Sequence, residues 1–457
     1  MESKQMAHST RVPLLESSKK YGKNESPWTS VLNMCNVAIG AGVLSFPYGF
    51  RQTGLLGGFL LTGCVWVVQI ITLCVLIRVT EKYNSQSYQE LVHTVLGPQM
   101  AVVSSLVMFS FLFGANVSYH IITGDVFEPI FIDIFGENSI FANRNFVLIL
   151  FGLVVILPLS LQRTLKALRY SSVLSVTMLS YLAIALISIG VAQLVTDGFP
   201  KGVLIFKAGI GAFITLDIVV FAFETQIQVV SIFAELTEHP HPFFKAFNKD
   251  QLQDEETPGS EIPVGAYRSE RVKRMDGVIF LSMTICFTLF TSVGIFGYLL
   301  FQDVESDVLK SFGNSNIFMN FARVGMAVVA MVCYPVQLHP ARSFVADAIK
   351  NLSKLQGSDS SLVRHVLITV GYFSATLGIA LSVTDLGKVF SIVGSTGGVM
   401  AMFIIPGTLL FMGSHNISPR GSGGQACTEV FGGTCIVVVG VIMFIATVYV
   451  TITGMPQ

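Results

Sequence analysis

The chain has 457 residues, of which 52% are hydrophobic and only 12% are charged, about half the charged share of an ordinary soluble domain. This composition excludes a soluble globular protein and predicts a polytopic membrane protein, because eleven spans of about 20 residues need roughly 220 residues of apolar character. The 28 basic and 28 acidic residues leave no net charge. A nucleic-acid partner is therefore not expected.

Apolar windows of about 19 residues predict an all-α fold with eleven transmembrane helices. The remaining segments are a polar cytosolic and disordered tail, a polar loop, and a short C-terminal tail, which we place at residues 1–29, 236–276 and 454–457. Because eleven is odd, the two termini are expected on opposite sides of the membrane. The predicted helices cover residues 30–50, 54–78, 99–123, 145–162, 171–195, 209–235, 277–301, 316–340, 362–384, 386–412 and 429–453.

Basic residues are concentrated in alternate connections, which predicts the orientation of the chain. The tail and every second connection carry nearly all of the lysines and arginines, whereas two of the other connections are rich in aspartate and glutamate. The positive-inside rule therefore places the N-terminus in the cytosol. The first 25 residues contain no apolar core, so we expect no cleaved signal peptide and take the first helix as the insertion signal.

The first span contains residues that disfavour a regular helix at mid-depth. Gly40 and Gly42 flank Ala41, with Asn36 one turn before and Pro47 after. Glycine and proline weaken helical pairing, and backbone groups exposed in hydrocarbon cost several kcal/mol unless they are satisfied. We interpret the segment as a cavity-lining break that binds a zwitterion or cation. The alternative is close helix packing through small residues.

The sixth span carries two acidic residues, Asp217 and Glu224. A separation of seven residues is about two helical turns, so both carboxylates are expected on one face if the helix stays regular. Acids inside a membrane are costly and usually functional. The alternative is a structural polar contact to a loop or an arginine, and no glycine marks a break in this span.

Three other features have weaker functional interpretations. Pro335 and Pro340 are expected to kink or end the eighth span. His120 and His339 are candidates for a proton relay, although a structural hydrogen bond is the commoner role of such histidines. The glycines of residues 394–398 favour close packing of the tenth span.

Several motifs occur in a characteristic order over residues 30–450. They are Asn36–Tyr48, Gly124–Phe127, Leu168–Ser172, Phe221–Phe223, Tyr334–Arg342 and Val393–Gly397. Together they resemble the amino acid/auxin permease family. Within it, the Tyr-Pro to His-Pro-x-Arg ending is most similar to vacuolar amino-acid transporters of fungi, and the sodium-coupled neutral amino-acid transporters of animals are the nearest relatives.

The resemblance implies a leucine-transporter-like fold. Residues 30–195 and 209–412 would be inverted repeats of five helices each, with the helix at 429–453 appended. An amino-acid site would lie between the broken first and sixth helices, where first-span backbone holds the substrate carboxylate and sixth-span residues surround the amine and side chain. The candidate substrate-binding residues are Asn36, Gly40, Ala41, Gly42, Phe221, Ala222, Phe223 and Glu224.

The resemblance also bears on the coupling ion. Sodium-coupled relatives have a Thr or Ser hydroxyl in the eighth helix just before the proline, whereas Met331–Tyr334 contains none here. The thiol of Cys333 is a poor ligand for a hard cation. An acid near the amine site can instead exchange a proton, so proton coupling is favoured. The candidate coupling-ion residues are Asn36, Asp217, Glu224 and Cys333.

The sequence thus predicts a secondary active amino-acid transporter, a symporter or antiporter coupled to protons, in a vacuole- or lysosome-like membrane. Two alternatives stay open, namely a sodium-coupled neutral amino-acid transporter of the plasma membrane and an amino-acid sensor that does not transport. The expected partners are an amino acid, H⁺ or alternatively Na⁺, and the lipid bilayer. No catalytic residue, cofactor or metal site is predicted, and the chain is not expected to be an enzyme.

Overall fold

The computed structural model describes residues 27–162, 171–236, 270–311, 317–353, 362–415 and 423–453. Within these ranges the regular elements are helices and no β-strand is formed, so the prediction of an all-α fold is confirmed. Residues 1–26 of the predicted tail, residues 237–269 of the predicted loop and the tail at 454–457 lie outside the described residues.

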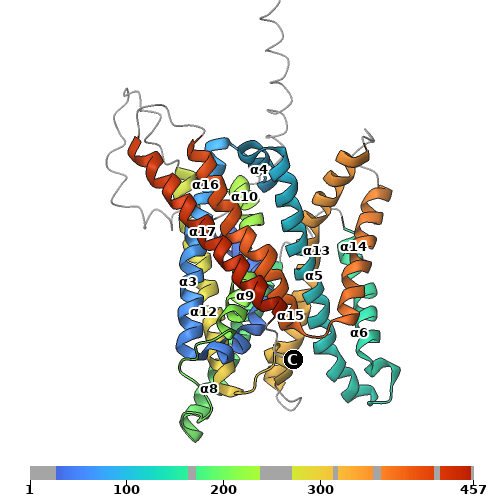
Figure 1. Cartoon of the computed structure of the whole chain (residues 1–457). Helices are drawn as coiled ribbons and strands as arrows, with labels where there is room; N and C mark the ends of the chain where they lie inside the picture. The colour runs from blue at the N-terminus through green and yellow to red at the C-terminus, as the bar shows by residue number, and fades with distance from the viewer. Residues whose placement is uncertain are drawn as a thin grey trace, which may run out of the picture.

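The first half of the chain forms the following elements, drawn in Figure 1: α2 (Pro27–Ala38), η1 (Ala41–Ser45), α3 (Phe46–Tyr83), α4 (Tyr88–Leu96), α5 (Pro98–Phe135), η2 (Ile140–Ala142), α6 (Arg144–Phe151), η3 (Gly152–Ile156), α7 (Leu157–Ser160), α8 (Ser171–Asp197), α9 (Gly211–Phe223) and α10 (Gln226–Glu235). The second half forms α12 (Glu270–Leu300), η5 (Val308–Ser311), α13 (Ile317–Ser353), α14 (Leu362–Ser382), α15 (Leu386–Val393), η6 (Gly394–Gly398), η7 (Met400–Ile404), α16 (Ile405–His415) and α17 (Gly423–Thr453).

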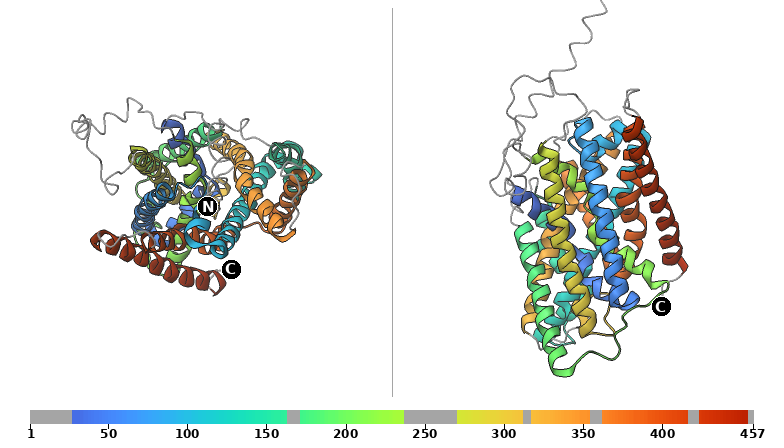
Figure 2. Two further views of the ribbon diagram at one scale, coloured as in Figure 1. Left: turned by 90° about the horizontal axis from the view of Figure 1, so that it is seen from above. Right: turned by 90° about the vertical axis from the view of Figure 1, so that its left-hand side faces the viewer.

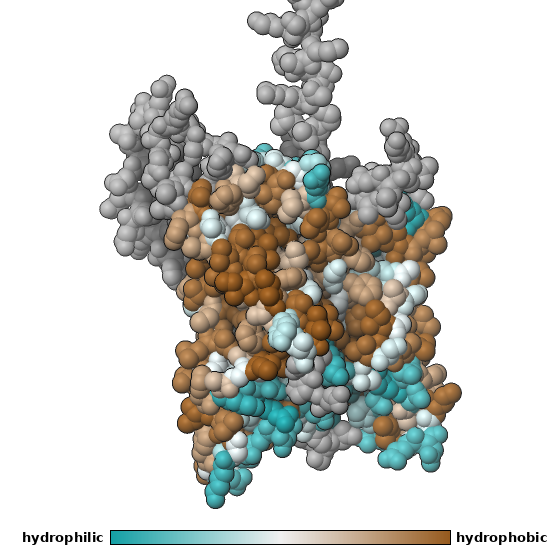
Figure 3. All heavy atoms as spheres, viewed as in Figure 1, coloured by the Kyte–Doolittle hydropathy of each residue, from teal (hydrophilic) through white to brown (hydrophobic). Residues whose placement is uncertain are grey.

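Several of these helices, alone or joined end to end, are long and apolar enough to cross a membrane. Nine spans among the described residues meet that standard by length and composition, and the surface forms a broad hydrophobic band with hydrophilic residues gathered at its lower edge (Figure 3). The first predicted helix is interrupted after α2, and the segment Arg144–Ser160 is shorter than a usual span. The count of eleven helices therefore remains a prediction.

Two groups of helices stand side by side (Figures 1 and 2). In one group α2 and α3 pack against α12, and α9 packs against α3; in the other, α13 and α14 pack against α5 and α6 packs against both α5 and α14. Helix α8 contacts both groups, and α15 with η6 lies between α9 and α5. We call the side where α2 begins the N-terminal face and the opposite side the far face.

The boundary between the first two predicted helices is a kink rather than a loop. Helix α3 runs through it, with Gly54 in a non-helical conformation at φ +77°. A Cβ on Gly54 would lie 2.7 Å from the carbonyl of Ile205, and the amides of Leu55 and Leu56 donate to the carbonyls of Leu204 and Ile205. The kink therefore needs glycine both for its φ and for this close approach.

Two expectations about later helices have different outcomes. Helix α13 continues through Pro335 and Pro340 to Ser353, so of the two expected outcomes the helix end is excluded and the kink stays a prediction. Neighbouring helices can support the freed backbone of a buried membrane helix. The packing role of the glycine run is confirmed, because a Cβ on Gly394 would collide with the backbone carbonyl of Asp217 on α9.

Candidate functional site

The first crossing is broken near the middle of the molecule. Helix α2 ends at Ala38, and the 3₁₀-helix η1 begins at Ala41 after Gly40. The first N–H groups of a helix have no partner within it, and those of Ala41 and Gly42 find no acceptor among the described residues. The break thus leaves two backbone donors free.

The glycines of this break allow close contact with neighbouring helices. A Cβ on Gly42 would lie 2.8 Å from the Cβ of Ala222 on α9, and one on Gly40 would lie 3.0 Å from the hydroxyl of Tyr119 on α5. Side-chain carbons rarely approach so closely. The absence of side chains at Gly40 and Gly42 therefore brings the free N–H groups against α9 and α5.

The sixth crossing is also broken, between Phe223 at the end of α9 and Gln226 at the start of α10. Two amides that would continue the helix donate elsewhere: Thr225 N to Gln226 Oε1 at 3.0 Å and Gln226 N to Glu224 Oε1 at 3.0 Å. The carbonyls of Phe221 and Ala222 consequently lose their i+4 donors. A shared face for Asp217 and Glu224 was expected only in a regular helix, and that condition is not met. The break that the resemblance implies for this helix is present instead.

Gln69 of α3 supports this second break. Its Nε2 donates to the carbonyl of Phe223 at 2.6 Å and to the hydroxyl of Thr225 at 3.0 Å, and its Oε1 accepts from Gln226 Nε2 at 2.8 Å. Gln69 is fully buried. This role of Gln69 was not predicted from the sequence, although a glutamine within an apolar span is itself a signal of a buried polar contact.

The two breaks enclose a small cavity of about 20 Å³. That volume is enough for about one water molecule, so the structure holds the space between the breaks closed. The carboxyl group of Glu224 is almost fully buried there, with the residue 3% exposed. The lining residues are Val37, Ala38, Gly40, Ala41, Gly42, Phe111, Ala115, Tyr119, Phe221, Ala222, Glu224 and Gln337.

Aromatic rings close the cavity toward the far face. The ring of Phe221 stacks on Phe390 of α15, with centroids 4.5 Å apart, and lies 5.3 Å from the ring of Phe111 on α5. Since Phe111 and Phe221 also line the cavity, these three rings form the aromatic closure. It joins α9 of one helix group to α5 of the other.

A hydrogen bond between two amides lies on the N-terminal side. Gln228 Nε2 on α10 donates to Gln337 Oε1 on α13 at 2.9 Å. Gln337 also lines the cavity. This pair, which we call the amide closure, again joins the two helix groups, and it was not predicted from the sequence.

Six of the predicted substrate-binding residues line the cavity and two do not. The ring of Phe223 packs instead against Phe290 on α12, with centroids 5.2 Å apart. Asn36 lies beside the cavity on α2 and accepts from the thiol of Cys333 at 3.7 Å. The cavity-lining residues Tyr119 and Gln337 were not predicted, and their polar side chains within apolar spans are the signal that could have found them.

The predicted coupling-ion residues do not form a single cluster. Asn36 and Cys333 meet, and Ser175 of α8 lies 3.6 Å from the Cys333 sulfur. Asp217 is 1% exposed on α9, and neither of its carboxylate oxygens has a hydrogen-bond partner among the described residues. Asp217 is absent from the cavity lining.

The two histidines singled out in the sequence lie apart from the cavity lining. His120 is fully buried, with its ring 4.9 Å from that of Tyr334 and 5.4 Å from that of Phe373. Neither ring nitrogen of His120 finds a hydrogen-bond partner in the described ranges. His339 is exposed on α13, two residues after Gln337. A relay through these histidines stays a prediction.

A loop on the far face, residues 301–311, covers the outer ends of several helices. Arg51 of α3 donates to the carbonyl of Val304 at 3.2 Å, and the hydroxyl of Ser45 donates to the carbonyl of Ser306. Lys310 Nζ lies 2.8 Å from Asp125 Oδ2 on α5, and Asp125 also pairs with Arg144 at 3.0 Å. We call residues 301–311 the far-face cover.

Asp307 is the most deeply buried acid of the far-face cover, at 1% exposed. Its Oδ1 accepts from Leu309 N at 2.9 Å, whereas its Oδ2 has no hydrogen-bond partner in the described part of the chain. Burial raises the pKa of Asp307 from 3.8 to about 7. The carboxylate of Asp125 acts in the same direction, while Lys310 and Arg323 oppose the rise.

Comparison with known families identifies the class of protein. The family model described as transmembrane amino acid transporter protein matches residues 23–249 and 266–453. The chain belongs to this family. The match spans both breaks, so the cavity between them lies within the part that the family shares.

Relatives of this chain are known from fungi and animals. It is 27% identical over 409 residues to vacuolar amino acid transporter 5 of Schizosaccharomyces pombe, and the aligned part covers 86% of each chain. It is 25% identical over 395 residues to sodium-coupled neutral amino acid transporter 7 of Xenopus laevis, covering 84% of this chain and 80% of that one. Vacuolar amino acid transporter 6 of Saccharomyces cerevisiae is 24% identical over 429 residues, covering 83% and 88%.

The fold also matches a solved structure. MhsT in complex with L-phenylalanine superposes with a TM-score of 0.56 at 14% identity, covering 95% of this chain and 100% of that one. The likeness confirms the leucine-transporter-like fold. At this identity it carries the fold alone.

We expect Gly42→Val to impair amino-acid binding without unfolding the transporter. The new side chain would collide with Ala222 and separate η1 from α9. Overpacking of this kind costs about 1–3 kcal/mol, and the middle of that range corresponds to roughly thirtyfold weaker binding. Binding of a labelled mixture of the 20 protein amino acids to purified protein measures the effect. Gly63→Val is the matched control, because a Cβ on Gly63 meets nothing within 4 Å; equal binding by both variants would contradict the assignment of the site.

We expect Asp307→Asn to stabilise the protein at neutral pH and to leave its stability unchanged in acid. A carboxyl group whose pKa rises on folding destabilises the folded state as it ionises, so its effect is absent below about pH 4 and grows until about pH 7. Melting temperatures of the variant and the unchanged protein should coincide near pH 4 and diverge toward pH 8. Asp303→Asn is the control, since the Asp303 side chain is 93% exposed; a pH-independent difference for Asp307→Asn would refute the buried ionisation.

Proposed function

We propose that this family member is a proton-coupled secondary active transporter that moves amino acids by alternating access. The observation that carries the proposal is the meeting of the two breaks at Glu224. Free backbone donors from η1, free carbonyls from α9 and a buried carboxyl group face one closed cavity between two helix groups. This is the set of groups that an amino acid and a proton require.

The backbone groups match the two charges of an amino acid. The N–H groups of Ala41 and Gly42 begin η1, and a helix N-terminus favours a negative ligand such as the α-carboxylate. The carbonyls of Phe221 and Ala222 end α9, and a helix C-terminus favours a positive ligand such as the α-ammonium group. A zwitterion bound between them satisfies all four groups.

Transport requires the cavity to open toward one face at a time. Its volume of about 20 Å³ leaves no room for an amino acid, so the structure represents a closed state. Opening toward the far face parts Phe221 from Phe390, and opening toward the N-terminal face parts Gln228 from Gln337. Both closures join the same two helix groups, so relative rocking of the groups can break one closure while keeping the other.

Glu224 is the proposed site of proton exchange. Its Oε1 accepts from the amide of Gln226 at the start of α10, and the residue lines the cavity. An ionised carboxylate in this position attracts the substrate ammonium, whereas a protonated one does not. Binding of the proton and of the substrate are therefore linked at Glu224. Asp217 is a second candidate, because an unpaired buried acid avoids a large desolvation cost by carrying a proton.

The surroundings of Asn36 support protons over sodium. A sodium ion needs several hard oxygen ligands, and the side chain beside Asn36 Oδ1 is the thiol of Cys333, 3.7 Å away. Sulfur is a poor ligand for a hard cation. Sodium coupling stays the alternative, because Asn36 Oδ1 and Ser175 Oγ are oxygens near this place and one relative is a sodium-coupled transporter by name.

The proposal also includes the membrane and the orientation. Two relatives are vacuolar amino acid transporters by name, and a vacuole- or lysosome-like compartment provides the proton gradient. The basic residues of the alternate connections support a cytosolic N-terminus, which makes the far face luminal. Inverted repeats over about 30–195 and 209–412, a cytosolic loop over 236–276 and an appended helix at 429–453 belong to the same proposal.

We expect Glu224→Gln to abolish amino-acid accumulation driven by a proton gradient while amino-acid exchange persists in part. The glutamine side chain keeps the shape of the glutamate side chain and can accept the hydrogen bond from Gln226 N, but it cannot exchange a proton. The measurement is uptake of the labelled 20-amino-acid mixture into proteoliposomes, under an imposed proton gradient and separately under an imposed sodium gradient.

Glu137→Gln is the control for this experiment, because Glu137 is an exposed acid at the far face. Unchanged proton-driven accumulation in Glu224→Gln would remove Glu224 from the coupling role. Accumulation by the unchanged protein under a sodium gradient alone would favour the sodium-coupled alternative. No accumulation or exchange under either gradient would contradict transport.

A further inference from the structure

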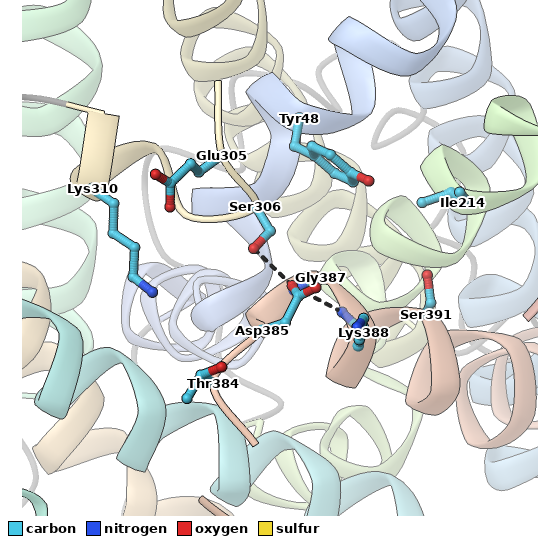
Figure 4. Close-up of a pocket in the computed structure, with 10 residues that line it drawn as sticks. All are labelled: Tyr48, Ile214, Glu305, Ser306, Lys310, Thr384, Asp385, Gly387, Lys388 and Ser391. Carbon is cyan, nitrogen blue, oxygen red and sulfur yellow. Dashed lines mark hydrogen bonds between the residues drawn. The ribbon is translucent and has the colours of Figure 1, made fainter. Parts of the chain in front are cut away.

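A second, larger cavity opens on the far face, and Figure 4 shows the side chains that line it. Its volume is about 360 Å³, so that, unlike the closed central cavity, it has room for a whole amino acid. Polar and charged side chains gather around it from α3, the far-face cover and the start of α15. We call it the vestibule, and its lining residues are Tyr48, Ile214, Glu305, Ser306, Lys310, Thr384, Asp385, Gly387, Lys388 and Ser391.

The vestibule lies on the route from the far face to the central cavity. Ile214 is on α9 two turns before Phe221, and Ser391 directly follows Phe390 on α15. The stacked rings of Phe221 and Phe390 therefore lie between the vestibule and the breaks. A solute that enters from the far face reaches the vestibule before the rings part.

Asp385 is held in place at one side of the vestibule. It caps α15, with its Oδ1 accepting from Gly387 N at 2.9 Å, from Lys388 N at 3.4 Å and from the hydroxyl of Ser306 at 2.9 Å. All three bonds use the same oxygen, and Oδ2 accepts none from the described residues. The carboxylate is thus fixed in position with one oxygen available to a ligand.

Of the two lysines that line the vestibule, only Lys388 is available to a ligand. Lys310 is committed to Asp125, with Nζ 2.8 Å from Oδ2. Lys388 is exposed, and its ammonium group forms no ion pair with any carboxylate among the described residues. The vestibule lining therefore presents an ammonium group without an ion pair, the carboxylate of Asp385 with one free oxygen, and the carboxylate of Glu305.

The ammonium group of Lys388 and the carboxylate of Asp385 together match a zwitterion better than a singly charged solute. An anion would meet the carboxylate of Asp385, and a cation would meet the ammonium group of Lys388, so either one gains a favourable contact and an unfavourable one. A molecule that carries both charges on adjacent atoms can pair with both groups. The α-amino acid is the zwitterion that the proposed function already requires.

We propose that the vestibule is a second amino-acid site, in which Lys388 pairs with the α-carboxylate and Asp385 accepts from the α-ammonium group before the aromatic closure opens. The choice of an amino acid as the ligand rests on the proposed function, and the location of the site rests on the geometry of the vestibule. The site raises the local concentration of substrate beside the closure. It also selects zwitterions before they reach the breaks.

Protection of a cysteine in the vestibule tests the site without measuring transport. Thr384 is exposed and lines the vestibule, so Thr384→Cys offers a thiol to a membrane-impermeant methanethiosulfonate reagent. Thr196→Cys is the matched control, since Thr196 is exposed at the far-face end of α8 and does not line the vestibule. Modification is read at each cysteine by peptide mass spectrometry, which separates it from the native cysteines.

A mixture of the 20 protein amino acids at twice its dissociation constant should slow modification at position 384 about threefold and leave position 196 unchanged. The same mixture after N-acetylation lacks the ammonium group and should not protect. Adding Lys388→Gln to Thr384→Cys should abolish protection, and Lys388→Arg should retain it, because arginine keeps the charge. Melting temperatures verify that each variant is folded.

Three results would overturn the vestibule site: no protection at position 384, equal protection by the N-acetylated mixture, or protection that persists in Lys388→Gln. The last result would assign protection to a conformational change caused by binding elsewhere. Failure of the proposed function looks different, since it appears as absent uptake by the unchanged protein in proteoliposomes. Protection that depends on Lys388 would support the vestibule site even then.

Discussion

Unpaired backbone groups inside a membrane are the constraint on which this structure depends. Each costs several kcal/mol in hydrocarbon, and the chain interrupts two helices at the same depth. The breaks are tolerable because they meet: Gly42 brings η1 against Ala222 of α9, and Gln69 pairs with both sides of the sixth break. What stays unpaired is a small set of donors and acceptors that face one cavity, so the cost of the breaks is concentrated where a ligand can offset it.

The two closures separate the cavity from the two faces of the molecule. The aromatic closure and the amide closure lie on opposite sides of the cavity, and each joins the helix group of α9 and α10 to that of α5 and α13, or to α15 between them. Stacked rings exclude water, whereas an amide pair separates at little cost because water replaces it. The far-face cover adds a further layer, in which Lys310, Asp125 and Arg144 connect the loop to α5 and α6. The vestibule lies between this layer and the rings.

The two breaks differ in how well the sequence predicts them, for a physical reason. Gly40, Gly42 and Pro47 weaken the first helix by local preference, so the first break was expected. The sixth break has no glycine or proline at Glu224 and Thr225, and it depends on Gln69, which is 154 residues away from its Phe223 partner in sequence. The only sequence signal of such a long-range hydrogen bond is a polar residue within an apolar span. For the same reason Tyr119, Gln228 and Gln337 were not predicted. Phe223 is adjacent to Glu224 in sequence, but it is the last residue of α9 and its ring packs against Phe290.

The central claim is that a bound amino acid occupies the backbone groups freed by the two breaks. Hydrogen–deuterium exchange of the purified protein, with and without the 20-amino-acid mixture, tests it most directly. The account predicts that the amino acids slow exchange in the peptides that contain Ala41–Ser45 and Phe223–Gln226, and leave the peptides of α17 unchanged. Exchange that stays equally fast at both breaks with saturating amino acids would contradict the claim and place the ligand elsewhere.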